Sequence, residues 1–261
     1  MTIRDVIRDS HVYLRNALKQ FSTVVRLHNL LVSTYVELME YKHSLKYQSP
    51  VDSKNVLYVD PEMIQYEQAP SSKFYKKPQY NRYRSYIETG DWDLQRRPLK
   101  EHPLYNFFKQ RFVEGKSWED LGYFDDISTE IDNGNTPWGY ETLSQFKNDL
   151  TKYDMIYNDI KTNGYKTQRQ LIDEGKVENR FSKKMDEILV NIGRDGEILL
   201  EDALHRTIIA KIIGLSKVPV RVFVRHSQWQ KMRETVYVRT NACQESADVK
   251  VRSHPDIPLE Q

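Results

Sequence analysis

Cysteine is almost absent from this chain of 261 residues, which contains Cys243 alone. A single thiol cannot close an internal disulfide, and it excludes the paired-cysteine and Cys/His patterns of structural zinc sites. A large excess of one charge is also missing, because 39 Lys and Arg against 37 Asp and Glu give a formal net charge of +2. This balance does not call for a large polyanion as partner. We expect such a chain in a reducing cytoplasm.

A long apolar run is the third absence. The longest charge-free stretch near the N-terminus, residues 27–36, has ten residues, whereas a membrane-spanning helix needs about 20. Residues 1–47 nevertheless place apolar side chains at helical intervals with Arg and Lys between them, which predicts a basic amphipathic helix. Such a helix packs on its own domain or lies on an anionic membrane surface. We favour packing and keep peripheral contact with the inner face of the membrane as the alternative.

Turn and breaker residues divide the rest of the chain. Residues 48–164 predict a mainly helical domain with a short strand at 56–59, a helix over 103–113 and the clearest helix over 141–162. Residues 165–240 predict strands at 186–192, 197–201 and 218–225, a tight turn at 194–196 and a helix over 205–213. Residues 241–261 predict a loose polar tail. The expected class is α+β, a helical N-terminal half followed by a small mixed-sheet module.

The junction between the strand at 197–201 and the following helix concentrates residues that can handle phosphate. Asp202, His205 and Arg206 stand there together. A helix start leaves N–H donors unpaired and favours anions. A guanidinium can clamp a phosphate with two N–H bonds, and an imidazole can donate a hydrogen bond or move a proton. We favour this interpretation over the simpler one, in which Asp202 caps the helix and Arg206 lies on the surface.

This stretch resembles the ParB/sulfiredoxin-like superfamily, whose signature is close to D-G-x-H-R, a helix ending in Leu-Gly or similar, and V-P-V on the next strand. The matching residues are Asp202, His205, Arg206, Ala210, Gly214, Leu215, Val218, Pro219 and Val220. Ala203 departs from the pattern, because the family usually has glycine there. The resemblance covers about residues 171–240, and it is nearest to the ParB-like kinases.

The resemblance implies a nucleotide-binding phosphotransferase that acts on a hydroxyl of a small molecule or a surface glycan precursor. It implies catalytic roles for Asp202 and His205. The implied phosphate- or nucleotide-binding residues are Ala203, Leu204, His205, Arg206 and Thr207. The implied nucleotide is ATP, ADP or CTP, with Mg²⁺ as an optional companion. In ParB-like kinases a glutamate takes the proton of the acceptor hydroxyl, and the candidates upstream are Glu178 and Glu187.

Two further clusters have alternative interpretations. Asp91 and Asp93 flank Trp92, so they could hold Mg²⁺ or form a tight turn around a buried indole, and we favour the turn. Residues 74–86 interleave aromatic and cationic side chains. That pattern suits single-stranded nucleic acid, a lid over an anionic ligand, or a loop packed by its own tyrosines, which we favour. The blocks 58–66 and 88–93 are similar to those of prokaryotic proteins that accompany cell-surface glycan assembly.

Other functions stay open at this stage. A nucleotide-gated DNA-binding or partition-type protein is one alternative, although the 37 residues after Val224 leave little room for the helix-turn-helix domain of ParB proteins. A ParB-like nuclease is a second, and a non-catalytic membrane-edge scaffold that uses residues 1–47 is a third. A sulfiredoxin-like reductase is excluded, because Leu204 occupies the place of its cysteine.

Overall fold

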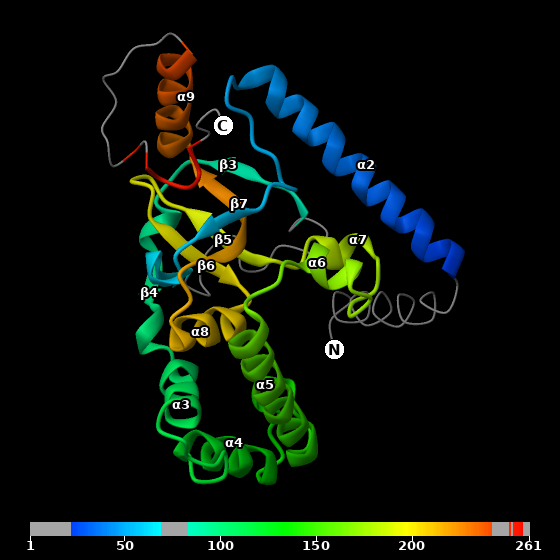
Figure 1. Cartoon of the computed structure of the whole chain (residues 1–261), viewed down its shortest axis with the longest axis vertical. Helices are drawn as coiled ribbons and strands as arrows, with labels where there is room; N and C mark the ends of the chain where they lie inside the picture. The colour runs from blue at the N-terminus through cyan, green and yellow to red at the C-terminus, as the bar shows by residue number, and fades with distance from the viewer. Residues whose placement is uncertain (1–21, 69–82, 242–250, 252, 258–261) are drawn as a thin grey trace.

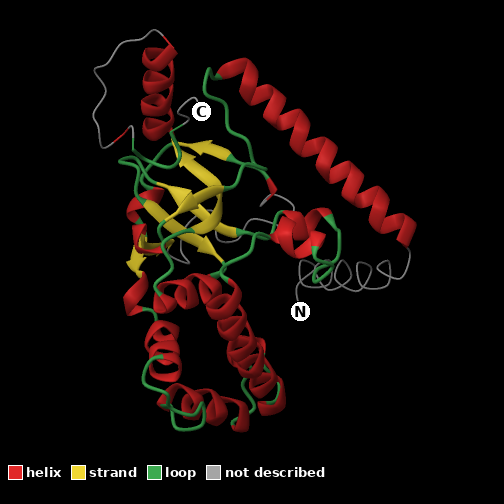
Figure 2. Cartoon of the chain, viewed as in Figure 1, coloured by secondary structure: helices red, strands yellow, loops and turns green. Residues whose placement is uncertain are grey.

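The computed structural model describes residues 22–68, 83–241, 251 and 253–257. A mixed β-sheet lies in the middle of the molecule, with helices around it (Figures 1 and 2). Helices account for more of the described residues before residue 188 than strands do, and two helices and one long strand follow residue 202. The expected α+β class with a helical N-terminal half is confirmed.

Seven strands form the described sheet, in the order β1-β7-β5-β6-β2-β4 with β3 also paired to β7. The strands are β1 Leu57–Val59, β2 Ile64–Gln68, β3 Tyr86–Glu88, β4 Arg96–Pro98, β5 Ile188–Ile192, β6 Ile198–Asp202 and β7 Val218–His226. Strands β5 and β6 form an antiparallel hairpin, whereas β7 runs parallel to β5 and β2 runs parallel to β6. Every residue of β5 and β7 is buried, which explains their Val/Ile-rich composition.

The sheet crosses the boundary that the sequence suggests near residue 164. Strands β1 to β4 come from the expected helical domain, yet β1 and β3 pair with β7, β2 pairs with β6, and β4 extends the sheet beyond β2. Each of β1, β3 and β4 has three residues. The strand expected at 56–59 is observed as β1, whereas β3 and β4 carry too little alternation of apolar and polar residues to be recognised in the sequence. The C-terminal module is therefore completed by strands that precede it in the chain.

Helices surround this sheet on several sides. They are α2 Ser22–Lys46, α3 Pro103–Phe112, α4 Gly122–Asp132, α5 Leu143–Asn163, α6 Gln168–Asp173, α7 Phe181–Lys184, α8 Leu204–Ile213 and α9 Ser227–Asn241. Helices α3, α4 and α5 form a lobe that projects from the sheet beside α8, and α2 runs along the outside of the molecule next to α7 (Figure 1). The start of α5 has a capping box between Thr142 and Gln145, and Gly164 ends it as expected.

Helix α8 joins two hydrophobic cores. Its Ala210 is packed in the sheet core with Val190 and Val220, whereas Ile208 and Ile209 are packed in the aromatic core of the α3–α5 lobe. All three α8 residues are fully buried. Burying one such isoleucine contributes roughly 1.5–3 kcal/mol. The position of α8, and of the junction that precedes it, is therefore fixed from both sides.

The polar tail expected from residue 241 is, over residues 253–257, packed against the fold. Asp256 is 3% exposed, and its carboxylate accepts hydrogen bonds from Arg225 on β7 and from the indole of Trp229 on α9. His254 contacts Trp229 edge-on. A buried carboxylate with two such donors anchors this segment firmly. The sequence shows none of this, because the partners lie on distant elements.

No described helix is both long enough and apolar enough to cross a bilayer. Part of the segment expected as a basic amphipathic helix, 1–47, is helical as α2 Ser22–Lys46, whereas residues 1–21, with most of its cationic side chains, lie outside the described residues. Most of the aromatic and cationic stretch at 74–86 also lies outside them.

Candidate functional site

The strand-to-helix junction has the local geometry that the motif suggests. Strand β6 ends at Asp202, Ala203 follows as the N-cap residue, and α8 begins at Leu204. Ala203 adopts a left-handed conformation with φ of 71° and ψ of 39°. Glycine takes this conformation without strain, whereas an L-residue with a Cβ does not. The position at which the resembled family has glycine is thus the position at which this chain turns left-handed.

Arg206 and His205 leave the junction toward different partners. Arg206 donates from Nη1 to the backbone oxygen of Asp186 at 2.7 Å and from Nη2 to its carboxylate at 3.0 Å. His205 instead stacks on Tyr153 of α5 with ring centroids 4.5 Å apart, and its Nε2 lies 3.1 Å from the Tyr153 hydroxyl. Burial lowers the pKa of His205 below its ordinary value, so the imidazole is neutral at pH 7.

Two of the remaining candidates are used within the fold. Thr207 is fully buried, and its hydroxyl donates to the backbone oxygen of Ala203 at 3.1 Å. Leu204 is packed against both hydrophobic cores. The backbone N–H of Ala203 donates to the Asp202 carboxylate at 2.7 Å. The side chains of Thr207 and Leu204 therefore hold the start of α8 in place.

A polar cavity of about 240 Å³ opens beside the junction. The motif predicts residues 202–207 as site residues. Of these six, all of them described, Asp202 alone lines the cavity. The lining residues are Tyr83, Ser182, Lys183, Met185, Asp186, Glu187, Leu189, Asp202 and Arg221. Leu189 pairs with Asp202 on β6 and with Arg221 on β7. Paired positions on neighbouring strands share a face, so the cavity lies on one face of the sheet.

Glu187 is the unusual group in this cavity. Its side chain is 4% exposed, its Oε1 accepts the backbone N–H of Gln168 at 2.6 Å, and its Oε2 has no hydrogen-bond partner among the described residues. Burial raises the pKa of Glu187 to about 7, against the opposing effects of the Gln168 hydrogen bond and of Arg206 and Arg221. A carboxyl group that titrates near neutral pH can give or take a proton there.

Arg221 faces the same cavity from β7. It is 1% exposed and donates to two backbone oxygens, those of Ser53 at 2.7 Å and of Met185. Its Nη2 has no hydrogen-bond partner among the described residues. Burial lowers its pKa to about 10, which leaves it a cation at pH 7. A buried guanidinium with an unused donor at a cavity wall is suited to bind an oxygen of a ligand.

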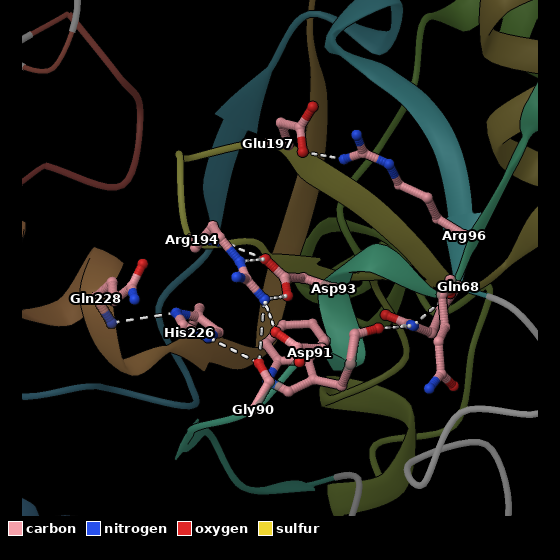
Figure 3. A network of polar contacts seen from close by, with 11 residues as sticks. Gln68, Gly90, Asp91, Asp93, Arg96, Arg194, Glu197, His226 and Gln228 are labelled. Atoms are coloured by element: carbon pink, nitrogen blue, oxygen red, sulfur yellow. Dashed lines mark hydrogen bonds and ion pairs between the residues drawn. The ribbon is translucent and has the colours of Figure 1, made fainter.

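Asp91 and Asp93, the candidate metal ligands, hold an arginine instead. Arg194 Nη2 donates to Asp91 at 2.8 Å and to Asp93 at 2.7 Å, and its Nε and backbone N–H donate to Asp93 at 2.9 Å (Figure 3). Burial acts to raise the pKa of Asp93, but the hydrogen bonds from Arg194 hold it below its ordinary value. The cation that these carboxylates bind is a guanidinium, and the tight turn with a buried Trp92 is the interpretation that holds.

Further contacts close this network (Figure 3). His226 on β7 contacts the Gly90 backbone oxygen through Nε2 and accepts the Gln228 N–H through Nδ1. Gln68 on β2 donates to the backbone oxygen of Trp92. No group of three metal-ligating side chains occurs in the described part of the chain. The network therefore ties β2, β7 and the β5–β6 turn together.

Of the cavity residues, Asp202 is predicted from the sequence as a site residue, and Glu187 is predicted only as one of two candidate bases with Glu178. Arg221 is not predicted. Arg221 belongs to the alternation of β7, in which arginine and phenylalanine alternate with valine. That alternation predicts a solvent-facing side, yet Arg221 is buried and donates to the backbone oxygens of Ser53 and of Met185, the C-cap of α7. A charged residue in a fully buried strand is unusual and points to a functional site, but it can be recognised only once the burial of the strand is known.

Comparisons of this chain with protein-family models, with curated proteins and with solved structures found no match.

Proposed function

We propose that this protein is a nucleotide-dependent phosphotransferase that acts on a hydroxyl group, with Glu187 as general base. One observation carries the proposal: a buried carboxyl with a pKa of about 7 and an unpaired oxygen lines the same cavity as Asp202, at the edge of the D-x-x-H-R junction. Structural carboxylates are paired when buried. An unpaired one at a cavity wall is suited to proton transfer.

The chemistry requires one proton transfer and one displacement. Glu187 takes the proton of an acceptor hydroxyl as the hydroxyl oxygen forms a bond to the terminal phosphorus of the nucleotide. The bond between that phosphorus and the bridging oxygen breaks, and the shortened nucleotide, a diphosphate from ATP or CTP and a monophosphate from ADP, leaves with the electron pair. Positioning and charge neutralisation supply most of the rate enhancement in such reactions. General-base assistance contributes about 10²–10⁴-fold.

Cationic and backbone donors beside the cavity suit the phosphates. Arg206 uses two N–H donors on Asp186, and a guanidinium has five. Lys183 and Arg221 line the cavity directly. The N–H groups of the first turn of α8 add a partial positive charge next to Asp202. His205 faces Tyr153, so in this proposal it positions α8 and does not catalyse.

A divalent ion bound with the nucleotide would take Asp202 and Asp186, the carboxylates of the lining other than Glu187. Mg²⁺ is usually held by one or two carboxylates together with substrate phosphates, so this pair fits it. When bound, such an ion neutralises phosphate charge. The acceptor is a small molecule or a glycan precursor that carries a hydroxyl, and the cytoplasm is the compartment that supplies the nucleotide.

Two variants test this proposal on the full chain. With ATP, ADP and CTP at millimolar concentrations, we expect a rise in the melting temperature of the wild type and loss of that rise in Asp202→Ala. Glu187→Gln keeps the shape and the Gln168 contact, so it should still be stabilised by nucleotide. With a panel of hydroxyl compounds as acceptors, we expect Glu187→Gln to lower nucleoside diphosphate release at least 100-fold.

Asp91→Ala is the matched control, because it removes an exposed carboxylate that binds Arg194 at the turn of the β5–β6 hairpin, the end opposite Asp202. It should leave nucleotide stabilisation and turnover unchanged. The proposal fails if none of the three nucleotides stabilises the wild type, or if Glu187→Gln turns over at the wild-type rate.

A further inference from the structure

Helix α2 has an apolar stripe that the rest of the described molecule leaves uncovered. Seven of the fourteen large hydrophobic side chains that are exposed among the described residues lie on this one helix. Five of these side chains are between 51% and 71% exposed: Leu27, Leu31, Leu38, Tyr41 and Leu45. Soluble proteins seldom leave so long a line of leucines in water, and such a surface usually marks an interaction site.

The spacing of the stripe is that of a coiled coil. One set of residues at intervals of seven is Leu31, Leu38 and Leu45. A second set at the same interval, displaced by three or four residues from the first, is Leu27, Thr34 and Tyr41. Assigning the first set to position a and the second to position d gives a heptad pattern over residues 27–45 that is apolar at every a and d position except Thr34. We call these six residues the α2 seam.

The opposite side of α2 is the one that packs on the molecule itself. Val36, at heptad position f, is fully buried. Glu40 accepts the backbone N–H of Ser53 at 2.8 Å. With 3.6 residues per turn, Val36 and the seam lie on opposite sides of the helix. The body of the molecule lies to one side of α2 (Figure 1), and Val36 and Glu40 are the α2 residues that contact it from the side opposite the seam.

The residues that flank the seam select the partner. In a parallel pair, position g of one helix lies beside position e of the next heptad in the other helix, five residues further on. Glu37 at g would face Lys42 at e, and their charges are opposite. Leu30 at g would face the ring of Tyr35 at e, and both are exposed, with the Tyr35 hydroxyl held by Arg84 of its own protomer. Both flanking pairs in this part of α2 are complementary when the second helix is another α2.

We propose that the protein forms a parallel homodimer through the α2 seam. The two helices form a short two-stranded coiled coil, and the two bodies lie on its outer sides. Each leucine of the seam then packs between residues of the partner helix. The Glu37–Lys42 pairs set the register, and the seam supplies the buried area.

The mass of the full chain in solution tests the dimer. We expect about 62 kDa for the wild type by light scattering or sedimentation, twice the chain mass of 31.0 kDa. Leu31→Glu with Leu38→Glu should give the monomer mass. Met155→Glu with Val238→Glu is the matched control, because these residues are exposed hydrophobics of other helices. The control should remain a dimer.

Charge reversal tests the register. Glu37→Lys and Lys42→Glu should each raise the dissociation constant by about 5-fold, since each places like charges together, and the double variant should restore the wild-type value. Glu37 also forms an ion pair with Lys54 in its own protomer, so Lys54→Ala is the control and should leave dissociation unchanged. In an antiparallel pair Glu37 would face Glu37 of the other copy, and the double variant would restore nothing.

Disulfide cross-linking gives an independent measurement. In a Cys243→Ser background, Leu31→Cys and Leu45→Cys should each cross-link to the same residue of a second chain, which only a parallel, in-register pair permits at both positions.

A wild type that is monomeric at every concentration, or a dimer that tolerates Leu31→Glu with Leu38→Glu, overturns the proposal. Binding of a monomeric wild type to anionic vesicles, lost in that double variant, would assign the seam to a lipid surface and overturn it as well.

Discussion

Charged side chains gather at both ends of the β5–β6 hairpin, and the two groups differ in whether their polar atoms are paired. At the turn, Asp91 and Asp93 hold Arg194 with hydrogen bonds of 2.7–2.9 Å. At the open end, Glu187 and Arg221 are both buried and each keeps a polar atom without a partner among the described residues. Paired groups stabilise a fold, whereas unpaired buried groups cost free energy. This difference in hydrogen-bond pairing distinguishes the structural network at the turn from the candidate site at the open end. The sequence alone does not show which charged residues are paired.

The largest expected effect concerns the pH dependence of stability at the open end. The pKa of Glu187 is about 7 in the folded protein against 4.5 as reference, so the folded state binds the proton more tightly. Stability is then full below pH 4.5 and is lost as the pH rises toward 7, by roughly 3 kcal/mol. Glu187→Gln should remove this loss. Urea unfolding of both proteins between pH 4.5 and 8 measures the difference.

The wild type should therefore be the less stable of the two at pH 8, and the two should converge at pH 4.5. A constant difference across this range would mean that Glu187 does not titrate within it, and the contrast between the two hairpin ends would lose its electrostatic basis.

The second effect breaks the turn cluster. Arg194→Ala leaves the Asp93 carboxylate, which is 1% exposed, without its guanidinium partner. We expect a loss of about 2 kcal/mol in the free energy of unfolding. Asp91→Ala is the control, because the Asp91 side chain is 77% exposed and should cost less than about 0.5 kcal/mol. Chemical denaturation at pH 7 compares the three proteins, and equal losses in both variants would contradict the assignment of Asp93 as the anchor.

The smallest effect concerns the left-handed residue at the junction. Ala203 has φ of 71°, a conformation that costs an L-residue about 1–2 kcal/mol. Ala203→Gly removes this strain but adds backbone entropy to the unfolded chain, so we expect a net gain of about 1 kcal/mol in stability. The thermal midpoint measures it. A loss of stability would show that the Ala203 methyl contributes more by packing against the sheet core than its backbone costs.

Local elements with a strong pattern could be predicted from the sequence. The helix over 141–162 is observed as α5 Leu143–Asn163, and the hairpin around 194–196 connects β5 and β6. The strand over 218–225 is observed as β7 Val218–His226. Each of these combines a clear period with capping or turn residues, so local preferences alone are enough to specify it.

The candidate site could be predicted only in part. Asp202 was found because a motif marks it at a strand end. The directions in which His205 and Arg206 point could not be predicted. Adjacent residues on a helix point about 100° apart, and the partners of these two, Tyr153 and Asp186, lie in other segments of the chain. Burial of Arg221 depends on residues 51–53, which are more than 150 positions away in the chain.

What the sequence by itself determined is the α+β class and the strand–helix–strand order around Asp202. These are local properties, set by periodicity and by backbone preference over a few residues. Only the tertiary structure decided that four early strands complete the sheet, that Arg194 neutralises Asp91 and Asp93, and that Glu187 is buried with an unpaired oxygen. Burial and pairing depend on contacts between segments far apart in the chain, and no local pattern encodes them.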